Sequence, residues 1–429
     1  MSNQYNNSVR RIQTISTHLS HQNSSDSKVL KSNDHTLYDI CVIGGGITGT
    51  STAYQLSKEG YKVLLLEQYK IGHDNGSSHG DGRIIRFSYP EDIYLELAKL
   101  AYPLWNDIEN ESGSKLIQIT GGIDFGSHKS QALIDLINAY KKHNIKYQVM
   151  EYQEANERFP QFNFQKENLI VYQQDAGVVY ATKAVQTIWE LAKRFGAVAL
   201  DDKKVDQIKV ESPELVTIQT VDQCIYKSKK VVLSCGGWIN EILLRSQLNL
   251  QIPVEASQEK VFYWSPKPET KNIDYSQYSN PVSIYYGEVD AFYSLPQIEI
   301  PGVKIGYHHS GNALSSMKEN KTKVYPPEFV EKIKKFVEKY NPGLDHSKES
   351  HSLTCVYTNT SDYHFIIDKH PRHQNVIIAS PCSGHGFKFG PAIGKVITQL
   401  IKHNKTSLST FHEFSLSRFN KSTNKRISA

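Results

Sequence analysis

The chain's first strongly patterned stretch opens with an apolar run. Residues 38–43 (YDICVI) are almost continuously apolar, as in strands buried on both faces of a parallel sheet. A glycine-rich turn follows at residues 44–49 (GGGITG). Beyond it, Ala53 and Leu56 recur at helical spacing, and Gly60 is suited to a helix C-terminus. The pattern therefore predicts a strand, a tight turn and a helix in succession.

A second apolar run completes this unit. Residues 61–68 (YKVLLLEQ) predict a strand that ends in Glu67, so the segment as a whole predicts a βαβ unit. Alternating helical and strand-like patterns continue along the chain without an internal repeat. The predicted helices are residues 95–109 and 183–196, the predicted strands are residues 260–266, 291–297 and 303–311, and residues 373–401 predict a strand, a glycine-rich loop and a helix.

The two ends of the chain lack this patterning. Residues 1–35 are rich in Ser, Asn, Gln and His and poor in large apolar residues, so they cannot bury enough surface to offset the entropy of ordering. They predict a disordered arm, with order beginning at Tyr38. Residues 416–429 are polar and basic and predict a loose tail.

Composition places the chain among ordinary globular proteins. Hydrophobic residues make up 39% and charged residues 22% of its 429 residues, and the net charge of +5 comes largely from the C-terminal lysines. We therefore expect no nucleic-acid partner, and because no apolar run approaches membrane-spanning length we expect no membrane partner. The five cysteines are scattered, odd in number and without a CxxC pair. This argues against a disulfide scaffold or a metal site and favours a reducing compartment.

The glycine turn carries a dinucleotide fingerprint. Gly44, Gly46 and Gly49 follow a strand and open a helix, and an acid, Glu67, ends the next strand. Gly44 permits the tight turn, Gly46 lets the backbone approach a pyrophosphate, and Gly49 permits close helix–strand packing. Glu67 would accept hydrogen bonds from the ribose hydroxyls and disfavour a 2′-phosphate. The alternatives are NAD in place of FAD, or a glycine-rich turn without a ligand.

The position of the fingerprint favours FAD. It lies near the N-terminus with the remaining strands scattered over a long chain, and residues 231–238 (VVLSCGGW) add a strand ending in a glycine pair. Cys355 stands in another strand-like run, residues 352–360 (SLTCVYTNT). A single cysteine is usually a small buried hydrophobe, so its role depends on its surroundings in the sequence.

Three stretches together carry a resemblance to a known family. They are residues 76–86 (GSSHGDGRIIR), 355–368 (CVYTNTSDYHFIID) and 383–389 (SGHGFKF). With the βαβ unit they resemble the monomeric sarcosine oxidase and pipecolate oxidase family of D-amino-acid-oxidase-like flavoproteins. The resemblance implies an α/β fold in which a Rossmann-like FAD-binding domain is interleaved with an α+β substrate domain built on a mixed, largely antiparallel sheet. We expect residues 36–86, 171–250 and 353–415 in the FAD-binding domain and residues 87–170 and 251–352 in the substrate domain.

The resemblance also implies a role for each matching residue. Cys355 matches the cysteine that binds FAD covalently as an 8α-S-cysteinyl thioether, and a thiolate is the nucleophile such a bond requires. Arg83 is implied beside the flavin, and Arg86 with Lys388 as the pair that holds a substrate carboxylate. The other implied site residues are Lys304 for O2 activation, His308 for orienting the amine, Tyr293 and Tyr357 as pocket tyrosines, and Gly384 and Gly386 at the cofactor.

Each of these residue types also has a plainer role. Most lysines and arginines are surface cations, and a tyrosine on a strand is usually part of a core or an interface. His309, next to His308, is expected on the opposite face of its strand and in a structural role. Gly82 departs from the family, where a small hydroxyl residue is common, which puts one hydrogen bond near the flavin in doubt.

The implied function is the oxidation of a secondary amino acid. We expect an FAD-dependent oxidase that converts sarcosine and O2 into glycine, formaldehyde and H2O2. The alternatives in the same class are an oxidase of L-pipecolate, N-methyltryptophan or fructosyl-amino acids. A flavin dehydrogenase with a protein acceptor is a different class, as are an NAD dehydrogenase and a non-catalytic dinucleotide-binding module.

The N-terminal arm contains a candidate address. Residues 11–19 (RIQTISTHL) resemble the N-terminal peroxisomal targeting signal, and a peroxide-producing oxidase would act where catalase is present. We therefore expect a peroxisomal monomer recognised by an import receptor, with a mitochondrial or untargeted, cytoplasmic protein as the alternatives.

Overall fold

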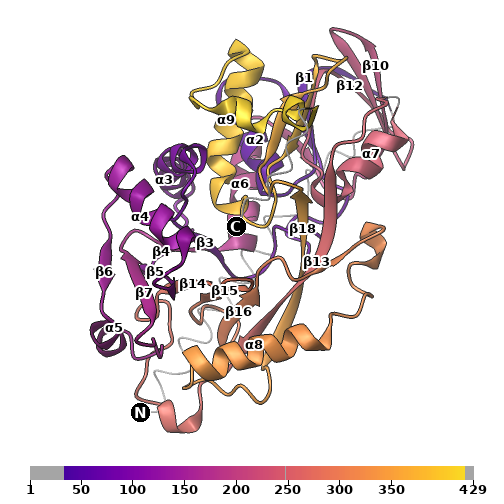
Figure 1. Ribbon diagram of the computed structural model, residues 1–429. Coiled ribbons are helices and arrows are strands. Elements are labelled where there is room, and N and C mark those ends of the chain that lie inside the picture. The colour runs from indigo at the N-terminus through magenta and orange to yellow at the C-terminus, as the bar shows by residue number, and fades with distance from the viewer. Residues whose placement is uncertain (1–32, 247, 421–429) are drawn as a thin grey trace, which may run out of the picture.

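The computed structural model describes residues 33–246 and 248–420 (Figure 1). Most of the predicted arm, including the candidate targeting motif at residues 11–19, lies outside the described residues. Strand β1 (Asn33–Ile43) begins before the predicted start of order at Tyr38. The reason is backbone pairing: Asn33 and Leu37 pair with Ile225 and Lys227 of the neighbouring strand across a register shift. Hydrophobic burial, on which the prediction relied, begins only further along.

A parallel core organises the first sheet, which has eight strands. Its order is β10–β11–β12–β1–β2–β9, and β20 pairs with β12 and with β19. The pairs β1–β2, β1–β12, β2–β9 and β12–β20 are parallel. The strands other than β1 are β2 (Val63–Leu66), β9 (Val198–Leu200), β10 (Val205–Ser212), β11 (Leu215–Thr220), β12 (Ile225–Leu233), β19 (Ile366–Lys369) and β20 (Val376–Ser380).

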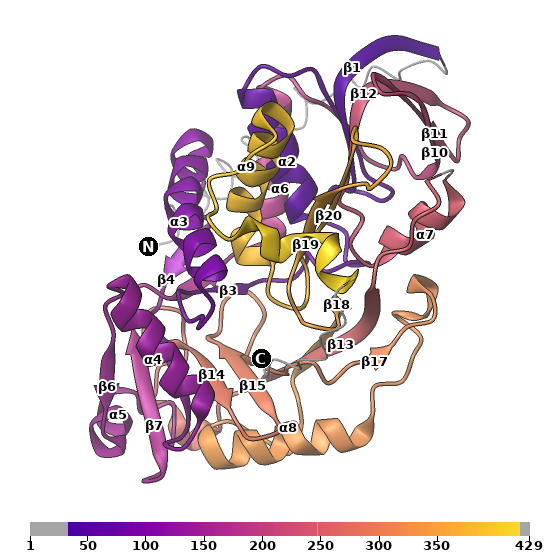
Figure 2. The same ribbon diagram turned by 45° about the horizontal axis from the view of Figure 1, so that its top comes forward.

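Both faces of this sheet are covered around its parallel strands, which explains why β2 and β20 are buried along their whole length and almost wholly apolar. Ile40 and Val42 of β1 pack into a core with helices on one face, and Cys41 and Ile43 pack into a second core on the other. The first face carries α2 (Ile47–Lys58), α3 (Asp92–Ser112), α6 (Ala181–Arg194) and α9 (Gly390–His403), and the second carries α7 (Ile239–Arg245) (Figure 2). The predicted βαβ unit is confirmed as β1–α2–β2.

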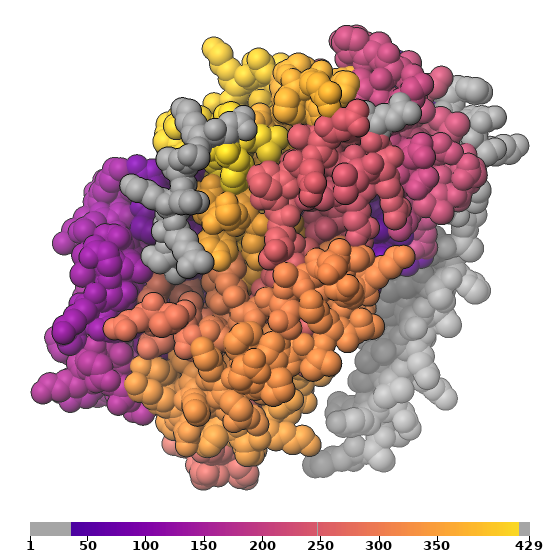
Figure 3. All heavy atoms as spheres, turned by 45° about the vertical axis from the view of Figure 1, so that its right-hand side comes forward, coloured from indigo at the N-terminus to yellow at the C-terminus, as the bar shows by residue number. Residues whose placement is uncertain are grey.

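The second sheet has nine strands in the order β17–β13–β16–β15–β14–β5–β7–β6, with β18 paired to β13. It is antiparallel except for the parallel pair β14–β5. Helix α8 (Pro327–Tyr340) packs on it. In Figure 3 the orange part of the chain, to which α8 belongs, forms much of the lower visible surface. The strands are β5 (Gly122–Ser127), β6 (Gln148–Met150), β7 (Asn168–Gln173), β13 (Val254–Trp264), β14 (Val282–Tyr286), β15 (Ala291–Leu295), β16 (Val303–Tyr307), β17 (Asn312–Ala313) and β18 (His351–Thr360).

Smaller elements join the two sheets. A three-stranded sheet is formed by β3 (Arg83–Ile85), β8 (Gly177–Val179) and β4 (Ile117–Ile119). Helices α4 (Gln131–His143) and α5 (Tyr152–Arg158) complete the part beside β5 to β7. No helix in residues 33–246 and 248–420 is long and apolar enough to cross a membrane.

Three predicted boundaries are corrected by the structure. The segment limits at residues 171 and 353 fall inside β7 and β18, and both strands belong to the nine-stranded sheet. The tail is not loose as far as residue 420, because a short 3-10 helix (Leu416–Asn420) is fixed there by Arg418, whose Nε and Nη2 donate to Asp362 at 2.7 and 3.1 Å. The division of the remaining segments into two domains stays a prediction.

Candidate active site

The glycine turn between β1 and α2 is a tight backbone loop packed on the end of β12. Gly44 has a φ of +103°, and a Cβ there would lie 2.4 Å from the Ser234 carbonyl oxygen. A Cβ on Gly49 would lie 1.8 Å from the carbonyl oxygen of Gly44. Gly46 is the N-cap of α2 and offers it no side-chain hydrogen bond, and no acid stands in the first helical turn. A helix N-terminus without an acid favours an anion such as a pyrophosphate, although the Ile47 amide already donates to Ser78 Oγ at 3.2 Å.

Glu67 lies directly after β2 and faces this turn. Its side chain is buried, and its Oε2 accepts a hydrogen bond from the Gly45 amide at 2.6 Å. Its Oε1 accepts one from the Tyr69 amide at 2.9 Å and lies 3.3 Å from His73 Nε2. The acid is thus held at the edge of the turn, where the sequence predicts contact with ribose hydroxyls.

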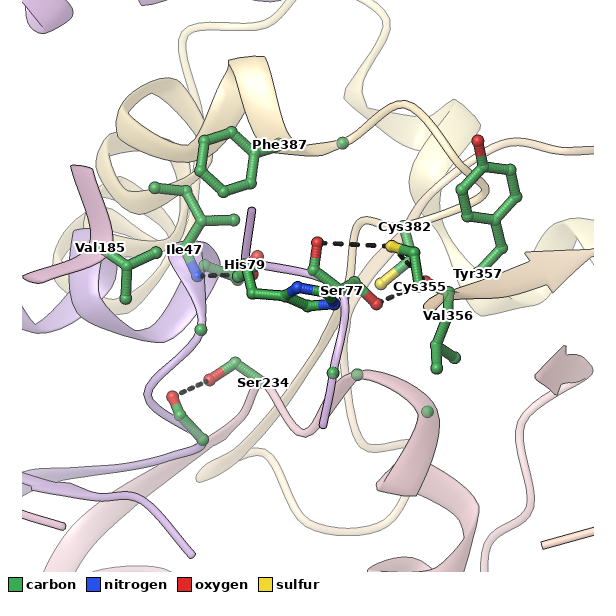
Figure 4. A pocket seen from close by; sticks show the side chains of 18 of the residues that line it. Ile47, Ser77, His79, Val185, Ser234, Cys355, Val356, Tyr357, Cys382 and Phe387 are labelled. Carbon is green, nitrogen blue, oxygen red and sulfur yellow. Dashed lines mark hydrogen bonds between the residues drawn. The ribbon is translucent and has the colours of Figure 1, made fainter. Parts of the chain in front are cut away.

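A long pocket connects the glycine turn with the second sheet. Its lining includes residues of both sheets and of the loops between them. Figure 4 shows the side chains of Cys355, Val356 and Tyr357 from β18, and of Ser77, His79 and Phe387 from outside the two sheets. The structure brings the following predicted site residues together in this lining: Gly44, Gly46, Glu67, Arg83, Arg86, Tyr293, Lys304, His308, Cys355, Tyr357, Gly384, Gly386 and Lys388. Gly49 stands behind the turn and does not line the pocket.

Cys355 lies in the pocket beside Arg83. The cysteine is buried on β18 and forms no disulfide. Arg83 Nη2 lies 3.6 Å from Cys355 Sγ and donates to the Ser77 carbonyl oxygen at 2.9 Å. Burial opposes the charge on Arg83, but the neighbouring Cys355 and tyrosines raise the pKa of the guanidinium overall. A permanent cation therefore stands next to the thiol.

His308 and Tyr357 form a hydrogen-bonded pair in the same lining. His308 Nδ1 and Tyr357 Oη are 3.1 Å apart, and the ring of Tyr293 meets His308 edge-on. Burial holds the pKa of His308 well below its usual value, so its imidazole is neutral. The prediction that His309 lies on the opposite strand face is wrong. Strand β16 ends at Tyr307, and His309 has a φ of +54° in the following turn. Its ring lies 4.0 Å from that of His308.

Lys304 is a buried cation on β16. Its Nζ donates to the Gly82 carbonyl oxygen at 3.0 Å and lies 3.8 Å from Asp81 Oδ1. Burial and Arg83 lower the pKa of Lys304 to about 8, against the opposing effect of Asp81. The lysine is therefore still mostly charged at neutral pH but closer to losing its proton than a surface lysine.

Gly82 has a packing reason for lacking a side chain. A Cβ there would lie 2.7 Å from Ile298 Cδ1, 2.8 Å from Val178 Cγ1 and 3.0 Å from Leu295 Cδ2. A hydroxyl residue would require these three apolar side chains to move. The main-chain carbonyl at this position still takes part in the site, since it accepts hydrogen bonds from Lys304 and from Arg83 Nη1.

Arg86 and Lys388 both contact one tyrosine, Tyr89. Arg86 Cζ lies 5.1 Å from the ring centroid of Tyr89, and Lys388 Nζ donates to Tyr89 Oη at 2.8 Å. Lys388 is buried, and this burial together with Arg86 holds its pKa well below the usual value. Within the described residues, no carboxylate lies within 4.0 Å of Lys388 Nζ, whereas Arg86 is paired with Asp124 at 3.0 Å. The arrangement can accept one further anion.

Sequence reasoning missed several residues that the structure places here. His79 lines the pocket with burial lowering its pKa to about 4, and its Nε2 has no hydrogen-bond partner among the described residues. Asp124 and Tyr286 contact Arg86 from two strands of the nine-stranded sheet. A signal for Asp124 was present, because residues 122–127 (GIDFGS) place a carboxylate in a strand with otherwise buried positions.

Comparison with known proteins finds relatives that match most of the chain. The family described as FAD dependent oxidoreductase matches residues 39–400. The monomeric sarcosine oxidase of Bacillus sp. (strain B-0618) is 33% identical over 392 residues, which cover 90% of this chain and 96% of the relative. The peroxisomal sarcosine oxidase of Homo sapiens is 32% identical over 367 residues, covering 85% and 92%.

Solved structures confirm the fold. NikD, described as an unusual amino acid oxidase essential for nikkomycin biosynthesis, superposes with a TM-score of 0.76 at 21% identity, covering 89% of this chain and 98% of NikD. The L-proline dehydrogenase of P. horikoshii also gives a TM-score of 0.76, at 23% identity, covering 90% and 98%. At these identities the similarity concerns the fold alone, and it agrees with the predicted two-sheet α/β architecture.

Proposed function

Since the chain belongs to the FAD-dependent oxidoreductase family, and within it to the group of the monomeric and peroxisomal sarcosine oxidases, we propose that it is an O2-dependent oxidase of small secondary amino acids. The proposed substrate is sarcosine, which with O2 and water yields glycine, formaldehyde and H2O2. One observation carries the choice of an amino acid: Arg86 and Lys388 both contact Tyr89, and Lys388 is a buried lysine with no carboxylate partner in the described chain.

The residues around the glycine turn fit FAD. The turn has no room for side chains at Gly44 or Gly49, no acid stands in the first turn of α2, and Glu67 is held beside it. These residues would hold the pyrophosphate and ribose. FAD supplies the two-electron oxidation, and the chain supplies binding, orientation and charge.

The cations of the pocket set the state of a bound amine. Arg83, Arg86, Lys304 and Lys388 all line it. Nearby positive charges and exclusion of water disfavour an ammonium group, so a secondary amine binds there without its extra proton. His308, which burial keeps neutral, and its partner Tyr357 Oη can receive a hydrogen bond from that amine. An uncharged amine with a free electron pair is the form from which a hydride equivalent can leave the adjacent carbon.

We further assign the covalent FAD link to Cys355. Its Sγ lies in the pocket beside the Arg83 guanidinium and makes no disulfide. The purified protein is expected to keep its yellow colour in the polypeptide pellet after acid precipitation. Cys355→Ser should release the flavin into the supernatant, whereas Cys224→Ser, at a buried cysteine outside the pocket lining, should not. Free flavin in the wild-type supernatant would refute the link.

A substrate panel tests the proposed reaction. Peroxide formation would be measured with sarcosine, L-pipecolate, N-methyltryptophan and a fructosyl-amino acid, each over a range of concentrations. We expect sarcosine to give the highest kcat/KM. A clear preference for L-pipecolate would move the assignment to that neighbouring substrate, and no activity with any of the four would refute the proposed class.

We also propose that the protein is a monomer of the peroxisome. The support is the naming of the human and mouse relatives as peroxisomal sarcosine oxidases, together with the motif at residues 11–19, which an import receptor would bind. A fluorescent protein carrying residues 1–35 should enter peroxisomes and should stay outside them when His18 and Leu19 are replaced by Ala. Size-exclusion chromatography with light scattering measures the oligomeric state.

A further inference from the structure

Asp124 is a buried carboxylate behind the proposed substrate end of the pocket. It lies within β5, and its side chain is almost fully enclosed. Its Oδ1 accepts hydrogen bonds from Arg86 Nη1 and Tyr286 Oη, both at 3.0 Å, and its Oδ2 accepts one from Ser88 Oγ at 2.5 Å. Arg86 is the only cation within 4.0 Å of this carboxylate in residues 33–246 and 248–420. A carboxylate so deeply buried needs such partners to stay ionised.

The pairing with Arg86 is one-sided. The hydrogen bonds from Arg86 to Asp124 and to Tyr286 both leave from one nitrogen, Nη1. A guanidinium that meets a carboxylate alone usually does so with two nitrogens in a fork. The edge formed by Nη2 and Nε is not used by Asp124, and Arg86 lines the pocket. Arg86 can therefore bind the carboxylate of a ligand while its own charge is already matched.

Charge in this part of the pocket depends on Asp124. Arg86 and Lys388 contribute two basic groups in contact with Tyr89, and Asp124 contributes one acid beside Arg86. Coulomb interactions are strong where water is excluded, so one charge at this depth is felt by any anion in the pocket. Without Asp124 the same pocket would attract carboxylates considerably more strongly.

We propose that Asp124 is a positioning and specificity-determining residue, which fixes Arg86 through Nη1 and cancels its charge, and so sets how strongly the pocket attracts a carboxylate. The inference rests on the proposed Arg86–Lys388 carboxylate site and adds the residue that moderates it. Asp124 acts through Arg86 and does not itself touch the substrate. Glycine, the proposed product, carries the same carboxylate as the substrate. Because Asp124 weakens the attraction of the Arg86–Lys388 site for carboxylates, it also allows glycine to leave.

The substitution Asp124→Asn removes the negative charge of this side chain and keeps its size. Asn keeps an oxygen for Arg86 Nη1 and Tyr286 Oη, and its amide can donate to Ser88 Oγ, which can turn its own proton to Tyr140 Oη 2.7 Å away. The probes are acetate and its uncharged analogue acetamide, titrated into the oxidised holoenzyme and followed by calorimetry and by flavin absorbance. We expect acetate to bind more tightly to Asp124→Asn, on the order of tenfold, with acetamide binding nearly unchanged.

An unchanged or weaker affinity for acetate in Asp124→Asn overturns the inference. A purely structural role would weaken acetate and acetamide alike, because a displaced Arg86 would lose contact with both ligands. Acetate that fails to bind the wild-type enzyme, or that binds without competing with sarcosine, refutes the carboxylate site itself and this inference with it.

A double variant tests whether Asp124 acts through Arg86. Arg86→Gln removes the only cation within 4.0 Å of Asp124 in the described chain, so acetate affinity should fall sharply and the buried Asp124 carboxyl should take up a proton. Adding Asp124→Asn to Arg86→Gln then replaces one neutral group by another, and acetate affinity should stay the same. A gain in acetate affinity on adding Asp124→Asn to Arg86→Gln contradicts the proposed role.

Discussion

Replacement of Lys304 by methionine is expected to slow reoxidation of the reduced enzyme by O2 about 100- to 1,000-fold. Lys304 Nζ is a buried cation held by the Gly82 carbonyl oxygen, and a fixed positive charge there would stabilise O2 as it gains negative charge. Loss of one such electrostatic contact typically costs about 2.7–4 kcal/mol. Reduction by substrate under anaerobic conditions should change little, so stopped-flow absorbance can follow the two half-reactions separately.

The pH dependence provides a control within the wild-type enzyme. Burial and Arg83 lower the pKa of Lys304 to about 8, so the lysine is charged below this pH and loses its charge above it. Reoxidation of the wild type should therefore slow as the pH rises through about 8, and reoxidation of Lys304→Met should lack this step. If the reduced Lys304→Met enzyme is reoxidised by O2 at the wild-type rate, Lys304 does not promote the reaction with O2. A flavin dehydrogenase with a protein acceptor would then become the better proposal.

Replacement of Lys388 by methionine should lower kcat/KM for amino-acid substrates about 10- to 150-fold, mainly through KM. The reason is the loss of a charge-assisted hydrogen bond to the substrate carboxylate, which is worth about 1.5–3 kcal/mol. The same change should leave the thermal unfolding midpoint equal or higher, because it removes a buried cation that has no carboxylate partner in the described chain. Steady-state kinetics and thermal unfolding of the holoenzyme measure the two effects.

Lys395→Met is the matched control for this change. Lys395 lies in α9, the helix that begins just after Lys388, and pairs with Glu59 at 3.0 Å on the surface. Its replacement should leave kcat/KM unchanged. The assignment of Lys388 to the carboxylate site would be contradicted by a normal KM in Lys388→Met. It would also be contradicted if kcat/KM fell equally for a secondary amine that lacks a carboxylate.

Local patterns predicted the parts of the site that depend on local geometry. The glycine turn is specified by neighbouring residues, because Gly44 must adopt a positive φ and Gly49 must pack against the turn itself. The resemblance to the sarcosine oxidase family supplied the side chains that meet across the pocket, such as Arg83 and Cys355, which are 272 positions apart in the chain. The structure places these residues in the lining of one pocket, and the roles that the resemblance gives them stay predictions.

The misses share a physical cause, which is pairing between distant segments. The sequence assigns no role to Asp124, because its contacts form only when β5 pairs with β14, which carries Tyr286, and lies within hydrogen-bond distance of Arg86. Strand alternation placed His309 wrongly because the strand ends at Tyr307, and a turn with positive φ returns the ring toward His308. The limit at residue 353 failed because β18 pairs along its whole length with β13, a register that no local pattern specifies.

The most direct test of the proposed function is the stoichiometry of sarcosine turnover by the purified holoenzyme. O2 consumption, H2O2 and formaldehyde would be measured together in the absence of any other electron acceptor. An oxidase of secondary amino acids should consume O2 and form H2O2 and formaldehyde in equal amounts, with the rate saturating in sarcosine. The proposal is contradicted if sarcosine reduces the flavin or an artificial dye without O2 uptake, or if neither sarcosine nor L-pipecolate is oxidised at all.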